Sequence, residues 1–277
     1  MTAYGFVGLG QIGALMAKHL PAADLIVYDI RPEAAAPLVE KGARAASALA
    51  EVAEAPLISI MVRDDEQVEE VVSALLPEAA AGTVIAIHST IHAATAERLA
   101  GTAAGRGIEI IDAPVSGGFM GADAARLAVM VGGSPEAFAK VEGPFAAFAD
   151  LVLHMGPVGS GTRAKLARNL LHFTAFTAAA EAQRLAEAAG ISLNKLGRVV
   201  RHSDAVTGGP GAIMVRQTTA RMDPTDPLHD IMRHTQALGE KDLTLALALA
   251  DSLNVDTPLA RLALQWFAPG LGLEEMP

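Results

Sequence analysis

The chain has 277 residues, of which 51% are hydrophobic and 19% charged, and this composition excludes a disordered or fibrous protein. Its formal net charge is -10 and no basic patch offsets it, so we expect neither a nucleic-acid partner nor binding to an anionic membrane. The absence of cysteine excludes disulfides, thiol catalysis and thiolate metal sites, and it suits a cytoplasmic protein.

In the first half of the chain, short β-branched apolar runs alternate with Ala-rich amphipathic runs. This alternation predicts a mainly parallel, doubly wound sheet of the Rossmann type, an α/β fold that binds its ligand at the carboxyl ends of the strands. The predicted strands are Tyr4–Val7, Leu25–Tyr28, Leu57–Met61, Thr83–Ile87, Glu109–Asp112, Leu127–Val131 and Leu151–His154.

The pattern changes after about residue 157, where no further strand is predicted. A long Ala/Leu/Glu/Arg-rich helix is expected from Lys165 to Ala189, with Gly190 ending it. The remaining predicted helices are Ser192–Arg201, Leu228–Leu253 and Pro258–Phe267. We therefore predict a dinucleotide-binding α/β domain over residues 1–157 and an all-helical C-terminal domain over residues 158–277, with the active site in the cleft between them.

The first motif, G-L-G-Q-I-G at residues 8–13, follows a predicted strand and opens a helical run to Leu20. Gly8 permits a tight turn, Gly10 lets a pyrophosphate approach the backbone, and Gly13 allows close packing of helix on strand. In this context the motif predicts a dinucleotide site. The alternative is a Gly-rich turn that binds no ligand.

Asp29 ends the second predicted strand, about twenty residues after Gly8. A carboxylate at this spacing suits the hydroxyls of the adenosine ribose and favours NAD, because it would repel a 2′-phosphate. Arg31 could instead hold that phosphate, so NADP remains possible.

The second motif is D-A-P-V-S-G-G at residues 112–118. The Ser116 hydroxyl and the backbone N–H groups of Gly117 and Gly118 could form a concavity for a small carboxylate. An ordinary Gly-Gly loop is the alternative.

Two further motifs lie on predicted helices. In G-S-G-T-R-A-K-L-A-R-N at residues 159–169, Lys165 and Asn169 are four apart and therefore share one helical face. A partly desolvated ammonium there could exchange a proton with a substrate hydroxyl. The last motif, K-D-L, begins at Lys241 and by itself reads as a solvated helix face.

Histidines offer a rival chemistry. His88 and His92 have a spacing that binds metals on a helix, but the first ends a strand, so we predict no metal site. His88 could lie close to the cofactor or substrate. His172, His202 and His234 could face the cleft, although hydrogen-bonded packing is the alternative for each.

In this order and at these separations the four motifs resemble those of the β-hydroxyacid dehydrogenase family, which includes 3-hydroxyisobutyrate dehydrogenase and tartronate semialdehyde reductase. The resemblance covers nearly the whole chain. It implies a fold plan like that of 6-phosphogluconate dehydrogenase, in which the helical domain binds substrate. The Ala-rich long helix and the 51% hydrophobic content indicate that this domain also buries surface against a second subunit, so we expect a homodimer or homotetramer.

The resemblance also assigns roles to residues. Lys165 becomes the catalytic residue and Asn169 its partner, while Ser116, Gly117 and Gly118 hold the substrate carboxylate. In the oxidation that this implies, Lys165 takes the proton of a β-hydroxyl as hydride leaves the same carbon for the nicotinamide, and the reverse reaction reduces the semialdehyde. The implied cofactor-binding residues are Gly8, Gly10, Gln11, Ile12, Gly13, Asp29, Arg31, Met61, Val62, Thr90 and Lys241.

Some positions depart from the family pattern. Ile12 replaces a Met, Val62-Arg63 replaces Leu-Pro, Ala93 replaces a Pro, and Leu170 replaces a second polar amide. The motifs therefore do not identify the substrate beyond its carboxylate. The residues that could line its pocket are Phe119, Met120, Arg201, His202 and Met214.

Two other functions remain as alternatives. One is an NADP-dependent imine reductase of the same plan, which the Lys165 motif and Asp29 disfavour. The other is a non-catalytic module that binds a dinucleotide or a protein.

Overall fold

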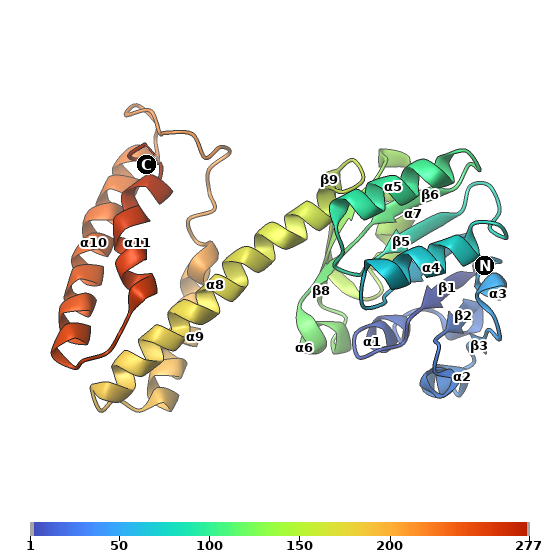
Figure 1. The fold of residues 1–277 in the computed structure, drawn as a ribbon, viewed down its shortest axis with the longest axis horizontal. Helices are drawn as coiled ribbons and strands as arrows, with labels where there is room; N and C mark the ends of the chain where they lie inside the picture. The colour runs from blue at the N-terminus through green and yellow to red at the C-terminus, as the bar shows by residue number, and fades with distance from the viewer. Residues whose placement is uncertain (1–2, 276–277) are drawn as a thin grey trace. The chain divides into compact units, whose positions relative to one another are not determined.

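The computed structural model describes residues 3–275 (Figure 1). Contacts divide the chain into two units, the first ending at Arg168 and the second beginning at Asn169, so the division falls within helix α8 (Ser160–Ala188). The fold class is the predicted one, a Rossmann-type sheet domain followed by an all-helical domain.

The first unit is built on a nine-stranded sheet in the order β3-β2-β1-β4-β5-β6-β8-β7, with β9 also paired to β8. The pairings of β8 with β6 and with β7 are antiparallel, and the others are parallel. The strands are β1 (Tyr4–Val7), β2 (Leu25–Tyr28), β3 (Arg44–Ala45), β4 (Leu57–Ile60), β5 (Val84–Ile87), β6 (Glu109–Asp112), β7 (Val115–Ser116), β8 (Leu127–Gly132) and β9 (Ala149–Gly156).

Helices cover both faces of this sheet, and each face has its own apolar core. Successive side chains of a strand point to opposite faces of the sheet, so in β1 Phe6 belongs to one core and Val7 to the other. The α-helices of this unit that precede α8 are α1 (Gly13–Ala17), α2 (Ala36–Val39), α3 (Leu49–Val52), α4 (Asp65–Leu75), α5 (Ala93–Ala104), α6 (Gly118–Asp123) and α7 (Pro135–Phe145).

Several boundaries differ from the predictions. The first helix ends at Ala17 rather than Leu20, because Pro21 disfavours the helical conformation just before it. The long helix α8 begins at Ser160 rather than Lys165. The two-residue strands β3 and β7 were not predicted, since neither is long enough to show an alternating pattern.

The second unit contains the rest of α8 with α9 (Leu193–Thr207), α10 (His229–Ser252) and α11 (Pro258–Gly270). Helices α10 and α11 lie side by side (Figure 1). Glycines in the left-handed conformation follow two of these helices, Gly190 after α8 and Gly208 after α9. Within residues 3–275 the structure contains no helix that combines the length and the apolar surface needed to cross a bilayer.

Candidate functional site

The turn between β1 and α1 has a shape that requires two of its glycines. Gly8 adopts a φ of +92°, and a Cβ there would collide with the Met61 carbonyl oxygen. A Cβ on Gly13 would collide with the Gly8 carbonyl oxygen. Gly10 has no atom within 4 Å of the position that its Cβ would take. The turn therefore leaves the Gly10 backbone open to a ligand, with a cradle that suits a pyrophosphate.

A cavity of about 390 Å³ lies beside this turn. It brings together Gly10, Gln11 and Arg31, which the motifs singled out, with two residues that they did not, Glu33 and Phe119. Phe119, a candidate for the substrate pocket, is exposed and lines this cavity. Its place in the sequence, directly after Gly117 and Gly118, does not predict this position, because the path of the chain into α6 decides where the ring lies.

Asp29 connects the second strand to the glycine turn. Its carboxylate accepts hydrogen bonds from the backbone N–H groups of Leu9 (2.7 Å) and Arg31 (2.9 Å), and Arg31 Nε lies 3.3 Å away. Burial raises the pKa of Asp29, but the hydrogen bonds from Arg31 and Leu9 and the Arg31 charge outweigh it and hold the pKa below its usual range. The carboxylate is therefore ionised at neutral pH beside the cavity.

The loops after β4 and β5 are joined next to Gly8. The Ser89 hydroxyl accepts from the Val62 backbone N–H (2.9 Å) and donates to the Val62 carbonyl oxygen (2.8 Å). Met61 and Val62 both line the underside of Gly8, and Thr90 is exposed one residue beyond Ser89. Ser89 belongs to none of the four motifs, although it stands in a Ser-Thr pair directly after a predicted strand.

The residues of the second motif lie where β7 turns into α6. Ser116 is half-buried on β7, opposite Ala128 of β8. Gly117 and Gly118 are exposed and have positive φ values of 135° and 62°. Their backbone conformation favours glycine, and it leaves N–H groups and a hydroxyl at the surface that can bind a small anion.

Lys165 lies in the second turn of α8, and only 8% of its surface is exposed. Burial, with a smaller contribution from the Arg168 charge, lowers its pKa from 10.5 to about 8. An amine with this pKa can act as acid or base near neutral pH. Asn169 follows one helical turn later and is half-buried.

The helix that carries Lys165 begins on a buried carboxylate. Asp112 has no exposed surface, and it accepts hydrogen bonds from the backbone N–H groups of Gly159 (2.7 Å) and Thr162 (2.6 Å). The second and third motifs are therefore joined directly, because Asp112 of the second motif contacts the start of the third.

His88 belongs to the core of the first unit. Its Nδ1 lies 2.7 Å from the Ala113 carbonyl oxygen and its Nε2 lies 3.0 Å from the Ser59 hydroxyl. Burial lowers its pKa to about 4, so the ring is neutral. The expectation that His88 could lie close to cofactor or substrate is wrong, because the buried ring packs against Phe145 and Phe148.

Other predicted residues lie on exposed surfaces. The His92 ring is exposed and its Nδ1 lies 3.1 Å from Asp65, and the described residues include no group of three or more His, Asp or Glu that could hold a metal. Lys241 lies on α10, is 61% exposed and forms an ion pair of 3.1 Å with Asp242.

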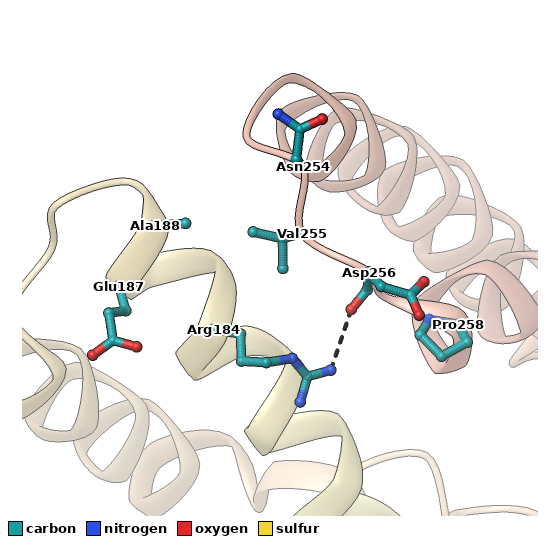
Figure 2. Close-up of a pocket in the computed structure, with 7 residues that line it drawn as sticks. All are labelled: Arg184, Glu187, Ala188, Asn254, Val255, Asp256 and Pro258. Carbon is teal, nitrogen blue, oxygen red and sulfur yellow. Dashed lines mark hydrogen bonds between the residues drawn. The ribbon is translucent and has the colours of Figure 1, made fainter.

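The helical unit has a cavity of its own, of about 580 Å³ (Figure 2). In Figure 2 the Arg184 guanidinium donates a hydrogen bond of 3.2 Å to the Asp256 carbonyl oxygen. The residues that line this cavity are Arg184, Glu187, Ala188, Asn254, Val255, Asp256 and Pro258. None of them belongs to a motif, so the candidate site remains with the glycine turn, the Ser116 loop and Lys165.

Comparisons with known proteins agree with both units. Residues 3–156 match the family model of the NAD-binding domain of 6-phosphogluconate dehydrogenase, and residues 159–272 match the NAD-binding model of NADP-dependent 3-hydroxyisobutyrate dehydrogenase. An uncharacterized oxidoreductase of Mycobacterium tuberculosis is 56% identical over 274 residues, covering 97% of this chain and 93% of that protein.

Two further proteins are similar over nearly their whole length. The 3-hydroxyisobutyrate dehydrogenase of Pseudomonas aeruginosa is 33% identical over 276 residues, covering 97% of this chain and 92% of that enzyme. The crystal structure of a Mycobacterium avium protein described as an oxidoreductase superposes with a TM-score of 0.95 at 51% identity, covering 99% of this chain and all of that one.

Proposed function

Since the chain belongs to the β-hydroxyacid dehydrogenase family of NAD(P)-dependent oxidoreductases, we propose that it oxidises a small β-hydroxy acid of the 3-hydroxyisobutyrate type to the semialdehyde, reversibly and with NAD. The observation that carries this proposal is the buried Lys165, whose pKa of about 8 suits proton transfer to and from a hydroxyl. The exposed Ser116-Gly117-Gly118 backbone would hold the carboxylate of the substrate.

The residues around the glycine turn fit a nicotinamide dinucleotide. The open space at Gly10 and the adjoining cavity would take the pyrophosphate, and the carboxylate of Asp29 would face the adenosine ribose. When bound, the cofactor supplies a hydride acceptor for oxidation and a hydride donor for reduction.

Lys165 would move the proton in both directions. As a free amine it takes the proton of the substrate hydroxyl, and as an ammonium it returns that proton to the developing alkoxide. Asn169, on the same helical face, would orient the reacting oxygen. The low exposure of Lys165 keeps water away from its amine and strengthens this interaction.

The direction of the pH dependence follows from the pKa of about 8 for Lys165. Oxidation needs the free amine, so we expect kcat/KM for oxidation to rise as the pH increases through about 8. Reduction needs the ammonium, so its kcat/KM should fall over the same range. Rate profiles in both directions would check this, and parallel profiles would contradict the role of Lys165.

The test of the reaction is an absorbance assay of NADH formation with a panel of small β-hydroxy acids. We expect one acid to be turned over and Lys165→Ala to lower kcat by about a thousandfold or more, while the NAD affinity stays within a few-fold. Lys41→Ala, which removes an exposed lysine of the same unit, is the matched control and should keep full activity.

Other results of this assay would favour the two alternatives. Turnover of cyclic imines with no turnover of hydroxy acids would point to an imine reductase. NAD binding with no turnover of any substrate would point to a non-catalytic module.

The preference for NAD rests on the charges around the cavity. Two carboxylates, Asp29 and Glu33, lie there against one guanidinium, Arg31, so a 2′-phosphate would meet net repulsion. We expect kcat/KM with NAD to exceed that with NADP at least tenfold, and Asp29→Asn to reduce that ratio. Arg31→Ala is the control and should increase the ratio, whereas a decrease would show that Arg31 binds a 2′-phosphate.

A cytoplasmic location completes the proposal, because a cysteine-free enzyme that uses the cellular nicotinamide pool suits a reducing compartment. Cell fractionation would test it.

A further inference from the structure

The buried carboxylate of Asp112 has no part in the proposed chemistry, although it begins the motif that holds the substrate. It ends β6, and its two oxygens each accept one backbone N–H, from Gly159 and from Thr162. These donors belong to the start of α8, where backbone N–H groups have no partner within the helix. Asp112 is therefore the N-terminal cap of α8, supplied by a distant strand.

Two glycines near Asp112 leave the space that this contact needs. A Cβ on Gly132 of β8 would collide with an Asp112 carboxylate oxygen, and a Cβ on Gly161 of α8 would collide with the Met130 carbonyl oxygen. The first turn of α8 is thus pressed against the ends of β6 and β8. Any larger residue at these positions would move the helix away from the carboxylate.

This turn also forms an ion pair with helix α5. The Arg163 guanidinium pairs with Glu97 of α5 at 2.6 Å, but both side chains are exposed, and exposed pairs contribute little. The buried Asp112 carboxylate, with its two hydrogen bonds to backbone N–H groups, is a stronger attachment than this exposed pair.

Lys165 lies three residues after Thr162, on the same face of the helix. We propose that Asp112 is a positioning residue, which fixes the first turn of α8 on the sheet and thereby holds the Lys165 amine in its buried place. This inference rests on the proposed role of Lys165. It gives the D-A-P-V-S-G-G segment two tasks, since its first residue places the catalytic lysine and its last three bind the substrate carboxylate.

The burial of Lys165 provides a readout that general destabilisation would not change. Burial and the Arg168 charge account for its lowered pKa, and the Asp112 charge is not among the causes. If α8 loosens from the sheet, Lys165 becomes hydrated and its pKa must rise toward 10.5. A variant that only unfolds more readily leaves the pKa of the folded molecules unchanged.

The experiment compares Asp112→Asn and Gly161→Ala with the unchanged protein, because both should release the first turn of α8 by different means. Glu181→Gln is the matched control. Its buried carboxylate also caps a helix, accepting from the backbone N–H groups of Leu259 (2.8 Å) and Ala260 (3.0 Å) at the start of α11. The Lys165 titration is followed by NMR of protein labelled with ¹³C-lysine, with the resonance assigned through Lys165→Ala, and kcat is measured in parallel.

We expect both variants to raise the pKa of Lys165 by about one unit or more, and to lower kcat at least tenfold while the KM for NAD stays within about twofold. Glu181→Gln should leave the pKa and kcat unchanged. An unchanged pKa in folded Asp112→Asn would overturn the inference. The titration needs no substrate, so it tests the role of Asp112 independently of the proposed function. The proposed function fails if Lys165→Ala keeps its turnover.

Discussion

At the scale of single residues, the environment of each ionisable group decides what it can do. Asp29 is half-buried, and hydrogen bonds hold its pKa below the usual range, so it stays charged. Lys165 is buried, and its burial and the Arg168 charge lower its pKa to about 8. His88 shows the third outcome, since its buried ring is neutral and serves as packing. The residue type alone does not predict which of these charge states a group adopts, because its burial and its hydrogen-bond partners decide it.

The burial of Lys165 makes stability depend on its charge. Its pKa falls from 10.5 in the unfolded chain to about 8 in the folded protein, which corresponds to a loss of up to about 3 kcal/mol of stability below pH 8. Lys165→Met has a similar volume and no charge. We expect it to abolish turnover and to raise the free energy of unfolding at pH 7 by about 1–3 kcal/mol.

Denaturant unfolding at several pH values would measure this gain. Between pH 8 and 10.5 the unfolded chain binds more protons at Lys165 than the folded protein does, so the stability of the unchanged protein rises with pH there. The advantage of Lys165→Met should therefore shrink over that range. A constant difference would mean that the substitution acts through packing alone, and Lys41→Met is the control for an exposed lysine.

At the scale of elements, two glycines of the turn between β1 and α1 have different roles, one in folding and the other in cofactor binding. Gly13 has no room for a Cβ, and Gly10 has no neighbour there at all. Gly13→Ala should therefore lower the free energy of unfolding by more than about 2 kcal/mol. Gly10→Ala should change it by about 0.5 kcal/mol or less and weaken NAD binding at least about tenfold.

Thermal unfolding and a fluorescence titration with NADH would measure these two effects in the same pair of variants. Equal loss of stability in both would contradict the geometry of the turn. Unchanged NADH affinity in Gly10→Ala would place the dinucleotide elsewhere.

At the scale of the whole molecule, the chain exposes more surface than two compact units of its size would, and the helical unit exposes many apolar side chains. Helix α9 has no buried residue among those described, and the exposed residues include Val206 at 74% and Leu170 at 72%. Two compact units of these sizes would expose about 13,500 Å² even without touching, whereas the chain exposes 15113 Å².

From this excess of about 1,600 Å² we propose that the protein is a homodimer or a multiple of it, since two copies that cover it would bury about 3,200 Å² in total, within the range of permanent homodimers. Light scattering should give at least twice the chain mass of 28.5 kDa. A monomeric mass at micromolar concentration would contradict the proposal. Val199→Glu on α9 should weaken the assembly, and Asn194→Glu, which adds the same charge on another face of the same helix, is the control.

The order of the main strands and helices follows from the pattern of residues along the chain, because the period of apolar residues reports which face of a strand or helix is buried. The same period predicted seven of the nine strands to within two residues but not the two-residue strands β3 and β7. Glycines and lysines at fixed spacings singled out the segments of the candidate site, since such spacings follow from local geometry. The contacts between residues far apart in the chain could not be predicted in this way and are seen only in the folded protein. The tertiary structure places Asp112 under α8, Phe119 beside the glycine turn and His88 in the core, because burial and hydrogen-bond partners come from residues far apart in sequence.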